Sequence, residues 1–208
     1  VSSFGRYGRL ADRIAFLFMR YKRVSDFVDV ARAHGLMVYN VQAMDISVSS
    51  SGVLSWSRKE FRCAIGRNGV TSEKIEGDGA TPVGCFVIRE VLYRPDKLPQ
   101  LVTDIPISTI KENDGWCDDP DDAHYNKRVA LPYPASHERL WRDDNLYDVV
   151  AVLGYNDKPV VPDKGSAIFM HVAAKNYAPT EGCIALALSD LVRILKEVSL
   201  NTKVCIHI

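Results

Sequence analysis

The sequence predicts a mainly β domain, a sandwich or a barrel with a few short helices, preceded by a helical N-terminal extension. Two observations support this fold class. From about residue 45 onward, short segments rich in β-branched and aromatic residues alternate with clusters of Gly, Pro, Asn and Asp. The chain also has 208 residues and no internal repeat, which suits a single domain with its own core. We therefore divide it into an extension, 1–44, and a domain, 45–208.

The extension has a helical pattern, because apolar residues such as Leu10, Ile14 and Leu17 recur at three- and four-residue steps. Residues 1–23 hold six basic side chains and one acidic side chain. Such a basic amphipathic helix is able to lie on a membrane surface. The simpler interpretation, which we favour, is a helix packed on the domain or an extension without function. A signal peptide is a third interpretation, although the apolar stretch at 14–19 is short for one.

The domain contains several expected strands and one clear helix. The helix is "SDLVRILKEV" at 189–198, where Ser189 suits the N-cap, Asp190 suits the first turn, and Leu191, Leu195 and Val198 form an apolar stripe. Phe61, Cys63 and Ile65 alternate and should share one strand face. The expected strands lie within 45–56, 59–66, 84–93, 148–155, 166–171 and 202–208.

Composition excludes several functional classes. Lys and Arg together equal Asp and Glu, so the formal net charge is zero, and a nucleic-acid partner is not expected. No apolar run approaches the roughly 18 residues of a membrane-spanning helix. The five cysteines are odd in number and contain no C-x-x-C, which argues against a disulfide framework or a zinc ribbon. We read Cys63 and Cys85 as small core residues. No metal or cofactor is expected.

The strongest candidate for chemistry is the stretch "HVAAKNYAPTEGCIAL" at 171–186. His171 ends an expected strand, and the loop after it is able to fold back and bring Cys183 beside the imidazole. A cysteine thiolate is a nucleophile, and a neighbouring histidine is a suitable base. Gly182 allows a sharp turn that leaves backbone N–H groups free to face an oxyanion. The alternative is a buried cysteine without a catalytic role, since cysteine is among the most buried residue types.

Two other local patterns have simpler explanations. Cys205 and His207 share one face of the last strand, where an outward-facing polar side explains both by alternation alone. The histidine in "SHER" at 136–139 lacks the second histidine of a metalloprotease motif.

The acidic segment at 111–126 does not match the spacing of a calcium-binding loop. A solvated surface loop is the simpler interpretation. Trp116 and Tyr125 are costly to leave in such a loop, however, and aromatic residues beside carboxylates would suit a substrate that carries an amine. Both interpretations remain open.

Two motifs together resemble the YkuD-type L,D-transpeptidase family. "TPVGCFVI" at 81–88 is similar to a T-P-x-G-x-F-x-I strand motif of that family. The stretch at 171–186 is similar to its catalytic motif, in which a histidine is followed after a dozen or more residues by [S/T]-x-G-C. The resemblance covers about 45–208. Two positions depart from the common pattern: Glu181 stands where many members have histidine, and Ala185 where many have arginine. The form T-x-G-C-[IV]-A-L resembles a smaller branch of the family.

The resemblance implies a mainly β L,D-transpeptidase catalytic fold that acts on peptidoglycan stem peptides. Cys183 would attack the bond between an L-centre of diaminopimelate and the following D-alanine, with His171 as its base. An amine from another stem would resolve the thioester, whereas water would give an L,D-carboxypeptidase. A non-catalytic wall-binding domain is the alternative from another class. Gly182 and Thr180 would support the oxyanion site, and the candidate substrate-binding residues are Trp116, Tyr125, Asn126, Tyr155 and Glu181.

The same resemblance implies a periplasmic or cell-wall location, although the chain shows no clean export signal. Expected partners are therefore stem peptides, with a membrane surface as a further partner of the N-terminal helix.

Overall fold

The computed structural model describes residues 45–208. The expected N-terminal helix and its contact with a membrane surface fall on 1–44, outside the described residues. Within the described part of the chain, no helix is both long enough and apolar enough to cross a membrane.

The described chain is built from short strands and one α-helix, as the sequence predicts. The expected strand at 84–93 matches β6 residue for residue. The segment 45–56 forms two strands instead of one, because Gly52, at φ +79°, makes the turn of a hairpin. The elements are β1 (Ile46–Ser49), β2 (Val53–Trp56), β3 (Lys59–Ala64), β4 (Val70–Thr71), β5 (Thr81–Pro82), β6 (Gly84–Tyr93), β7 (Ile107–Thr109), β8 (Asp114–Cys117), β9 (Arg128–Ala130), β10 (His137–Arg139), β11 (Val149–Leu153), β12 (Phe169–Val172), the 3₁₀ helix η1 (Lys175–Tyr177), β13 (Ile184–Leu186), α3 (Leu188–Glu197) and β14 (Lys203–His207).

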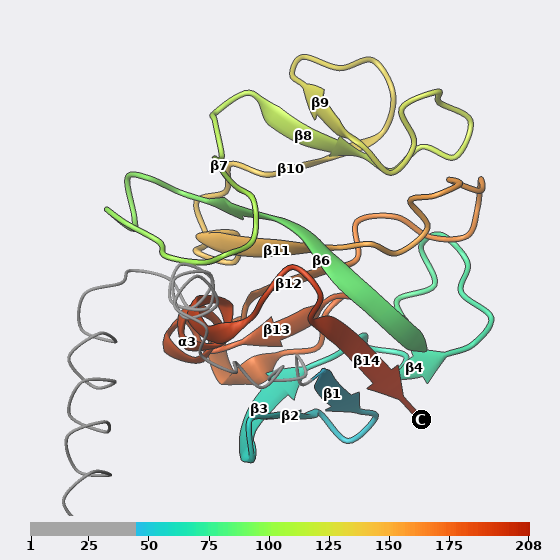
Figure 1. Cartoon of the computed structure of the whole chain (residues 1–208). Coiled ribbons are helices and arrows are strands. Elements are labelled where there is room, and N and C mark those ends of the chain that lie inside the picture. The colour runs from blue at the N-terminus through green and yellow to red at the C-terminus, as the bar shows by residue number, and fades with distance from the viewer. Residues whose placement is uncertain (1–44) are drawn as a thin grey trace, which may run out of the picture. The chain divides into compact units, whose positions relative to one another are not determined.

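The largest sheet closes on itself like a barrel. Its strand order is β11-β12-β13-β3-β2-β1-β14-β6-β7, and β6 also pairs with β11. The first half of β6 pairs with β14 and the second half with β11, so this one long strand joins both ends of the sheet (Figure 1). Closure leaves few strand edges unpaired, which protects a mainly β protein from association through its edges.

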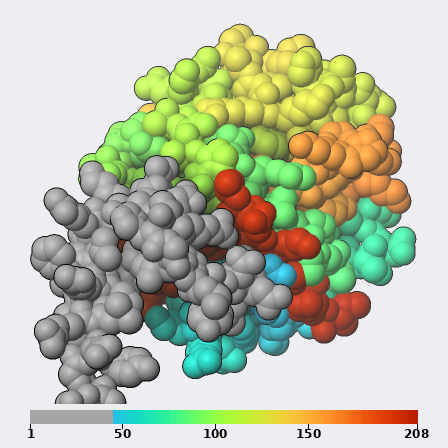
Figure 2. Space-filling model, in the orientation of Figure 1, coloured from blue at the N-terminus to red at the C-terminus, as the bar shows by residue number. Residues whose placement is uncertain are grey.

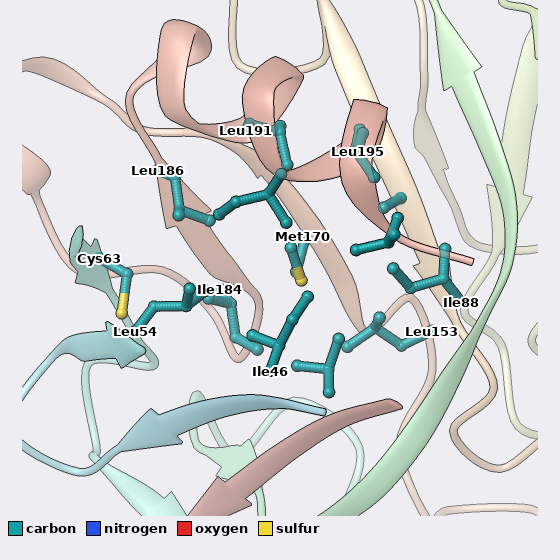
Figure 3. Packing of buried hydrophobic residues seen from close by; sticks show 14 of the residues in the cluster. Ile46, Leu54, Cys63, Ile88, Leu153, Met170, Ile184, Leu186, Leu191 and Leu195 are labelled. Atoms are coloured by element: carbon teal, nitrogen blue, oxygen red, sulfur yellow. The ribbon is translucent and has the colours of Figure 1, made fainter. Parts of the chain in front are cut away.

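The interior of the barrel holds the main hydrophobic core. Ile46, Leu54, Ile184 and Met170 come from different strands and point toward one another in Figure 3. α3 covers one end of this core with the apolar stripe expected from the sequence, and Leu191 and Leu195 are fully buried. Ser189 is not the N-cap, because the helix begins one residue earlier and Ala187 occupies the cap position without a side-chain hydrogen bond.

A second layer covers the other face of β11 and β12. In β11, alternate residues belong to two clusters: Ala151 faces the barrel core, and Val150 faces a cluster that includes Trp116, Tyr147 and Phe169. Both faces of these strands are therefore buried. A small antiparallel sheet of order β10-β8-β9 forms this outer layer, and its segment of the chain gathers as one lobe in Figure 2.

Two sequence interpretations change with the structure. The acidic segment at 111–126 is not merely a solvated loop, because it contains β8, in which Asp114–Cys117 are all buried. Cys85 is not a core residue. It lies on the outer side of β6 and forms a disulfide with Cys205, its direct partner across the antiparallel β6–β14 pair. The two cysteines are 120 residues apart, so only the strand pairing brings them together.

Candidate active site

Cys183 and His171 open onto the same cavity, which has a volume of about 540 Å³. Its walls come from four segments distant in sequence, and they carry more carboxylates than cations. This is a pocket of ordinary size for a small ligand or a peptide end. The lining residues are Lys74, Glu76, Gly77, Asp118, Glu138, Arg142, Leu146, Tyr147, Ser166, Ala167, Ile168, His171, Ala174, Ala178, Pro179, Thr180, Glu181 and Cys183.

A tight turn at 180–183 presents Cys183 to the cavity. Thr180 holds the turn through its hydroxyl, which donates to the carbonyl of Cys183 at 2.6 Å and accepts from the N–H of Gly182 at 3.2 Å. Its backbone N–H donates to the carbonyl of Ile65, which ties the turn to the end of β3. Gly182 has φ +136°, a conformation that residues with a side chain rarely adopt.

The thiol of Cys183 is held between two backbone groups of the neighbouring segment. The sulfur donates to the carbonyl of Ala167 at 3.1 Å and accepts from the N–H of Phe169 at 3.4 Å. Among the described residues these are its hydrogen-bond partners, and the imidazole of His171 is not one of them. Burial raises the pKa of Cys183 to about 12. The resting side chain is therefore a neutral thiol that needs a base.

His171 lies on β12, on the strand face that also carries Phe169, as the alternation of the sequence predicts. Its Nδ1 is 2.9 Å from the carbonyl of Val172. A carbonyl only accepts, so Nδ1 carries the proton and Nε2 keeps its lone pair. Burial lowers the pKa of His171 to about 4, against the opposing effect of the carbonyls of Val172 and Leu146. The imidazole is therefore neutral at physiological pH, as a base must be.

Three cavity residues that the sequence did not single out form a connected group, one member of which packs on the imidazole. The ring of Tyr147 meets that of His171 edge to face at 5.2 Å between centroids, and its hydroxyl donates to Glu138 at 2.7 Å. Arg142 lies 3.7 Å from the same carboxylate and is bound to Asp144 by two hydrogen bonds. Burial raises the pKa of Glu138 above its usual range. No motif marks these residues, because β10 and the loop before β11 approach the site only in the folded chain.

Most candidate substrate-binding residues lie behind the cavity wall. Asn126 has φ +57° and uses its whole amide: Oδ1 accepts from the indole of Trp116 and from the N–H of Ala167, and Nδ2 donates to the carbonyls of Tyr155 and Asn156, at 2.9–3.0 Å. Through Ala167, this hub supports the carbonyl that holds the thiol. Trp116 is buried and packs edge to face on Phe169, with 5.0 Å between the ring centroids.

The remaining candidates divide between wall and cavity. Tyr125 is buried and donates to Glu76, whereas Tyr155 packs on Phe86, and neither lines the cavity. Glu181 does line it and pairs with Arg67 at the exposed rim, where both side chains are largely solvated. Contact of substrate with any of the five candidate residues stays a prediction.

Because the amide of Asn126 is fully used, Asn126→Asp should destabilise the fold. The new carboxylate oxygen would replace two donated hydrogen bonds with repulsion against the carbonyls of Tyr155 and Asn156. We expect the free energy of unfolding to fall by about 2 kcal/mol. Urea denaturation measures it, and Asn113→Asp at an exposed position is the matched control. Equal losses in the two variants would show that the hub has no structural role.

The other chemical candidates do not form a second site. Cys205 is bound to Cys85, and His207 is exposed, so this pair has no free thiol. Cys63 is buried in the main core as expected, and burial raises the pKa of its thiol to about 11. Within residues 45–208, no group of three or more His, Cys, Asp or Glu side chains is placed to hold a metal ion.

The departure at Ala185 has a clear structural setting. Ala185 is fully buried in β13, where it is paired with His171 of β12 on one side and with Ala64 of β3 on the other. An arginine here would have to leave this packed position to reach solvent.

Comparison with known proteins gives one match. The model of the YkuD family, described as the L,D-transpeptidase catalytic domain, matches residues 44–206. A search of the curated proteins finds no match. The matched region contains the whole cavity and all of the barrel except the last residue of β14, His207.

Proposed function

The chain belongs to the L,D-transpeptidase catalytic-domain family, and from that premise we propose that it joins peptidoglycan stem peptides through a thioester on Cys183. The observation that carries the proposal is the shared cavity: a free thiol and a neutral imidazole open onto one pocket large enough for a peptide end. Acyl transfer needs a nucleophile, a base and donors for an oxyanion, and this arrangement supplies the first two directly.

In the acylation step, Nε2 of His171 takes the proton from the sulfur of Cys183 as the sulfur attacks the carbonyl carbon of the L-centre of diaminopimelate. The S–C bond forms, and the carbonyl oxygen becomes an oxyanion. When the intermediate collapses, the C–N bond to D-alanine breaks, and the leaving amine receives the proton from His171. The thiol and imidazole must approach each other for this step, since apo hydrogen bonds at active sites often tighten only with substrate bound.

In the second step, an amine of another stem attacks the thioester carbon, and His171 takes the proton of that amine. The C–S bond breaks, and the sulfur of Cys183 regains a proton from the imidazole. The product contains a new peptide bond between stems, and the enzyme returns to its starting state. Water in place of the amine would release a tripeptide.

The N–H of Cys183 is the natural oxyanion donor, because it belongs to the reacting residue itself. The N–H of Gly182 is engaged by the Thr180 hydroxyl at 3.2 Å, a long contact that an oxyanion is able to compete with. Thr180 then acts by holding the turn, through its shorter bond to the Cys183 carbonyl.

Intact-protein mass spectrometry with disaccharide-tetrapeptide tests the proposal. We expect an acyl adduct on the wild type and none on Cys183→Ala, with cross-linked dimer among the products. Free tripeptide without dimer would identify a carboxypeptidase. Unchanged muropeptides together with no adduct on the wild type would contradict acyl transfer altogether and favour a wall-binding domain.

We also propose that the protein acts outside the cytoplasm, in the periplasm or the cell wall. The disulfide between Cys85 and Cys205 supports this, because such bonds persist in oxidising compartments. Thiol labelling of the denatured protein from fractionated cells tests it. We expect three labelled cysteines, namely Cys63, Cys117 and Cys183, in an extracytoplasmic fraction. Five labelled cysteines in a cytoplasmic fraction would contradict the proposal.

A further inference from the structure

Lys74 is a buried charge that the steps above do not use. It lies in the loop between β4 and β5, and its side chain is only 5% exposed although it lines the cavity of Cys183. The ammonium donates to Asp78 at 2.5 Å and to the carbonyl of Ile75 at 3.0 Å. Its aliphatic stem lies so close to Gly165 that a Cβ there would be 2.9 Å from Cγ of Lys74. The position of the ammonium is therefore fixed from several sides.

The ion pair is oriented with respect to the cavity. Lys74 lines the cavity and Asp78 does not. The carboxylate of Asp78 also accepts from the N–H groups of Ile75 and Ala80, at 2.9 and 2.8 Å. These bonds and Lys74 lower the pKa of Asp78 despite its partial burial, so it is an anion at neutral pH. Lys74 is thus the member of the pair that borders the cavity, and its positive charge acts to lower the pKa of the Cys183 thiol against the larger, raising effect of burial.

The loop that carries this pair also touches the turn of the nucleophile. The carbonyl of Ala80 would lie 2.9 Å from a Cβ on Gly182, the residue before Cys183. A buried ion pair is weak support for stability, since well-packed apolar residues of the same volume often serve as well. A fixed cation on the same cavity as a thiol has a chemical use, because a nearby positive charge favours the anionic form of the thiol.

We propose that Lys74 is a positioning residue of the site, whose fixed positive charge favours the thiolate of Cys183 and the oxyanion that forms beside it. This inference rests on the proposed role of Cys183 as nucleophile. Many members of the family have an arginine at the position of Ala185, and Lys74 would place a cation on the cavity from a different segment. The remaining ionisable groups on the cavity include four carboxylates, which oppose the thiolate, and one further cation, Arg142, which is engaged by Glu138 and Asp144. These ionisable groups are Glu76, Asp118, Glu138, Arg142, Tyr147, His171 and Glu181.

The rate at which iodoacetamide alkylates Cys183 tests this without any peptidoglycan. At a fixed pH below the pKa of the thiol, this rate follows the thiolate fraction. Peptide mass spectrometry assigns the label to Cys183, and the full chain is used throughout. We expect Lys74→Met to slow alkylation at pH 8 by roughly tenfold and Asp78→Asn to speed it several-fold. Lys203→Met, which removes an exposed cation on β14, should leave the rate unchanged.

The double variant Lys74→Met/Asp78→Asn separates charge from loosening of the loop. If charge acts, the two effects largely cancel, and the rate lies at or slightly below that of the wild type. If the substitutions merely open the cavity, the double variant is the fastest of all. If Lys74→Met fails to fold, the alkylation rates of Asp78→Asn and the double variant still distinguish the two explanations. A charge effect makes Asp78→Asn the faster of the two, whereas loosening of the loop makes the double variant the faster.

Alkylation rates within twofold of the wild type in both single variants would overturn the role of Lys74. A double variant that reacts faster than all the others would overturn it as well. Absence of any label on wild-type Cys183 would also overturn it, because the thiol would then not be reachable. The first two results leave the acyl adduct with disaccharide-tetrapeptide untouched, and that adduct tests the proposed function separately.

Discussion

Replacing His171 with glutamine is expected to slow the acylation of Cys183 by roughly a thousandfold. Glutamine has a similar size and is able to keep a hydrogen bond to the carbonyl of Val172, but its amide cannot take a proton. Since burial keeps the pKa of Cys183 at about 12, the thiol ionises little by itself and depends on the base. The rate of adduct formation, followed by mass spectrometry with disaccharide-tetrapeptide, measures the effect.

The matched control is His207→Gln, which removes an exposed imidazole on the last strand and should leave the rate unchanged. It also tests the other Cys–His pair of the sequence directly. Comparable rates for His171→Gln and the wild type would exclude His171 as the base.

The pH dependence of the wild type follows from the same residue. The base works only as neutral imidazole, and burial lowers the pKa of His171 from 6.5 to about 4. The acylation rate should therefore rise as pH increases through about 4 and be insensitive to pH near 6.5. An acidic limb centred near 6.5 would mean that His171 titrates as an exposed histidine and that the site opens in solution.

The second large effect is expected for Gly182→Ala, which should lower the free energy of unfolding by about 3 kcal/mol. At φ +136°, an L-residue is strained, and the added Cβ would stand 2.9 Å from the carbonyl of Ala80. The carbonyl belongs to backbone and has little room to move. The turn would have to shift, which would also displace the thiol from the carbonyl of Ala167. Urea denaturation and the alkylation rate of Cys183 measure the two consequences.

Gly69→Ala provides the matched control for this substitution. Gly69 also has a positive φ, +78°, but a Cβ there would meet nothing within 4 Å. Only the conformational cost remains, and a loss of about 1 kcal/mol is expected. If Gly182→Ala cost no more than Gly69→Ala, the close approach of the Ala80 loop to the nucleophile turn would be disproved.

The sequence predicted the strands and singled out Cys183 and His171 because both leave local signals. Period-2 alternation placed His171 and Phe169 on one face of β12, and the structure confirms that this face turns toward the cavity side. The apolar stripe of α3 was equally readable. Ser189 was misassigned as its cap because capping residues also occur inside first turns, and boundaries depend on local dihedral angles that composition does not fix.

The acidic segment shows where local reasoning stops. Its carboxylates suggested solvent, yet β8 within it is buried because β9 and β10 pair on either side and Trp116 packs on Phe169. The sequence suggested Asn126 as a substrate-binding residue, but it lies behind the cavity wall, in a position that depends on contacts with Tyr155 and Ala167, 29 and 41 residues away. Long-range contacts of this kind leave no periodic trace.

The sequence by itself determined that this chain is a mainly β domain, and it singled out Cys183 and His171 as the candidate residues for chemistry, because strand alternation and the T-x-G-C turn are local properties of the backbone. Only the tertiary structure decided what surrounds that pair. The disulfide of Cys85, the carboxylate of Glu138 and the buried ammonium of Lys74 all arise from segments that meet through sheet closure. In a closed sheet, strand register decides which residues become neighbours, and these residues are distant in sequence. No single stretch of the chain therefore shows which residues surround Cys183 and His171.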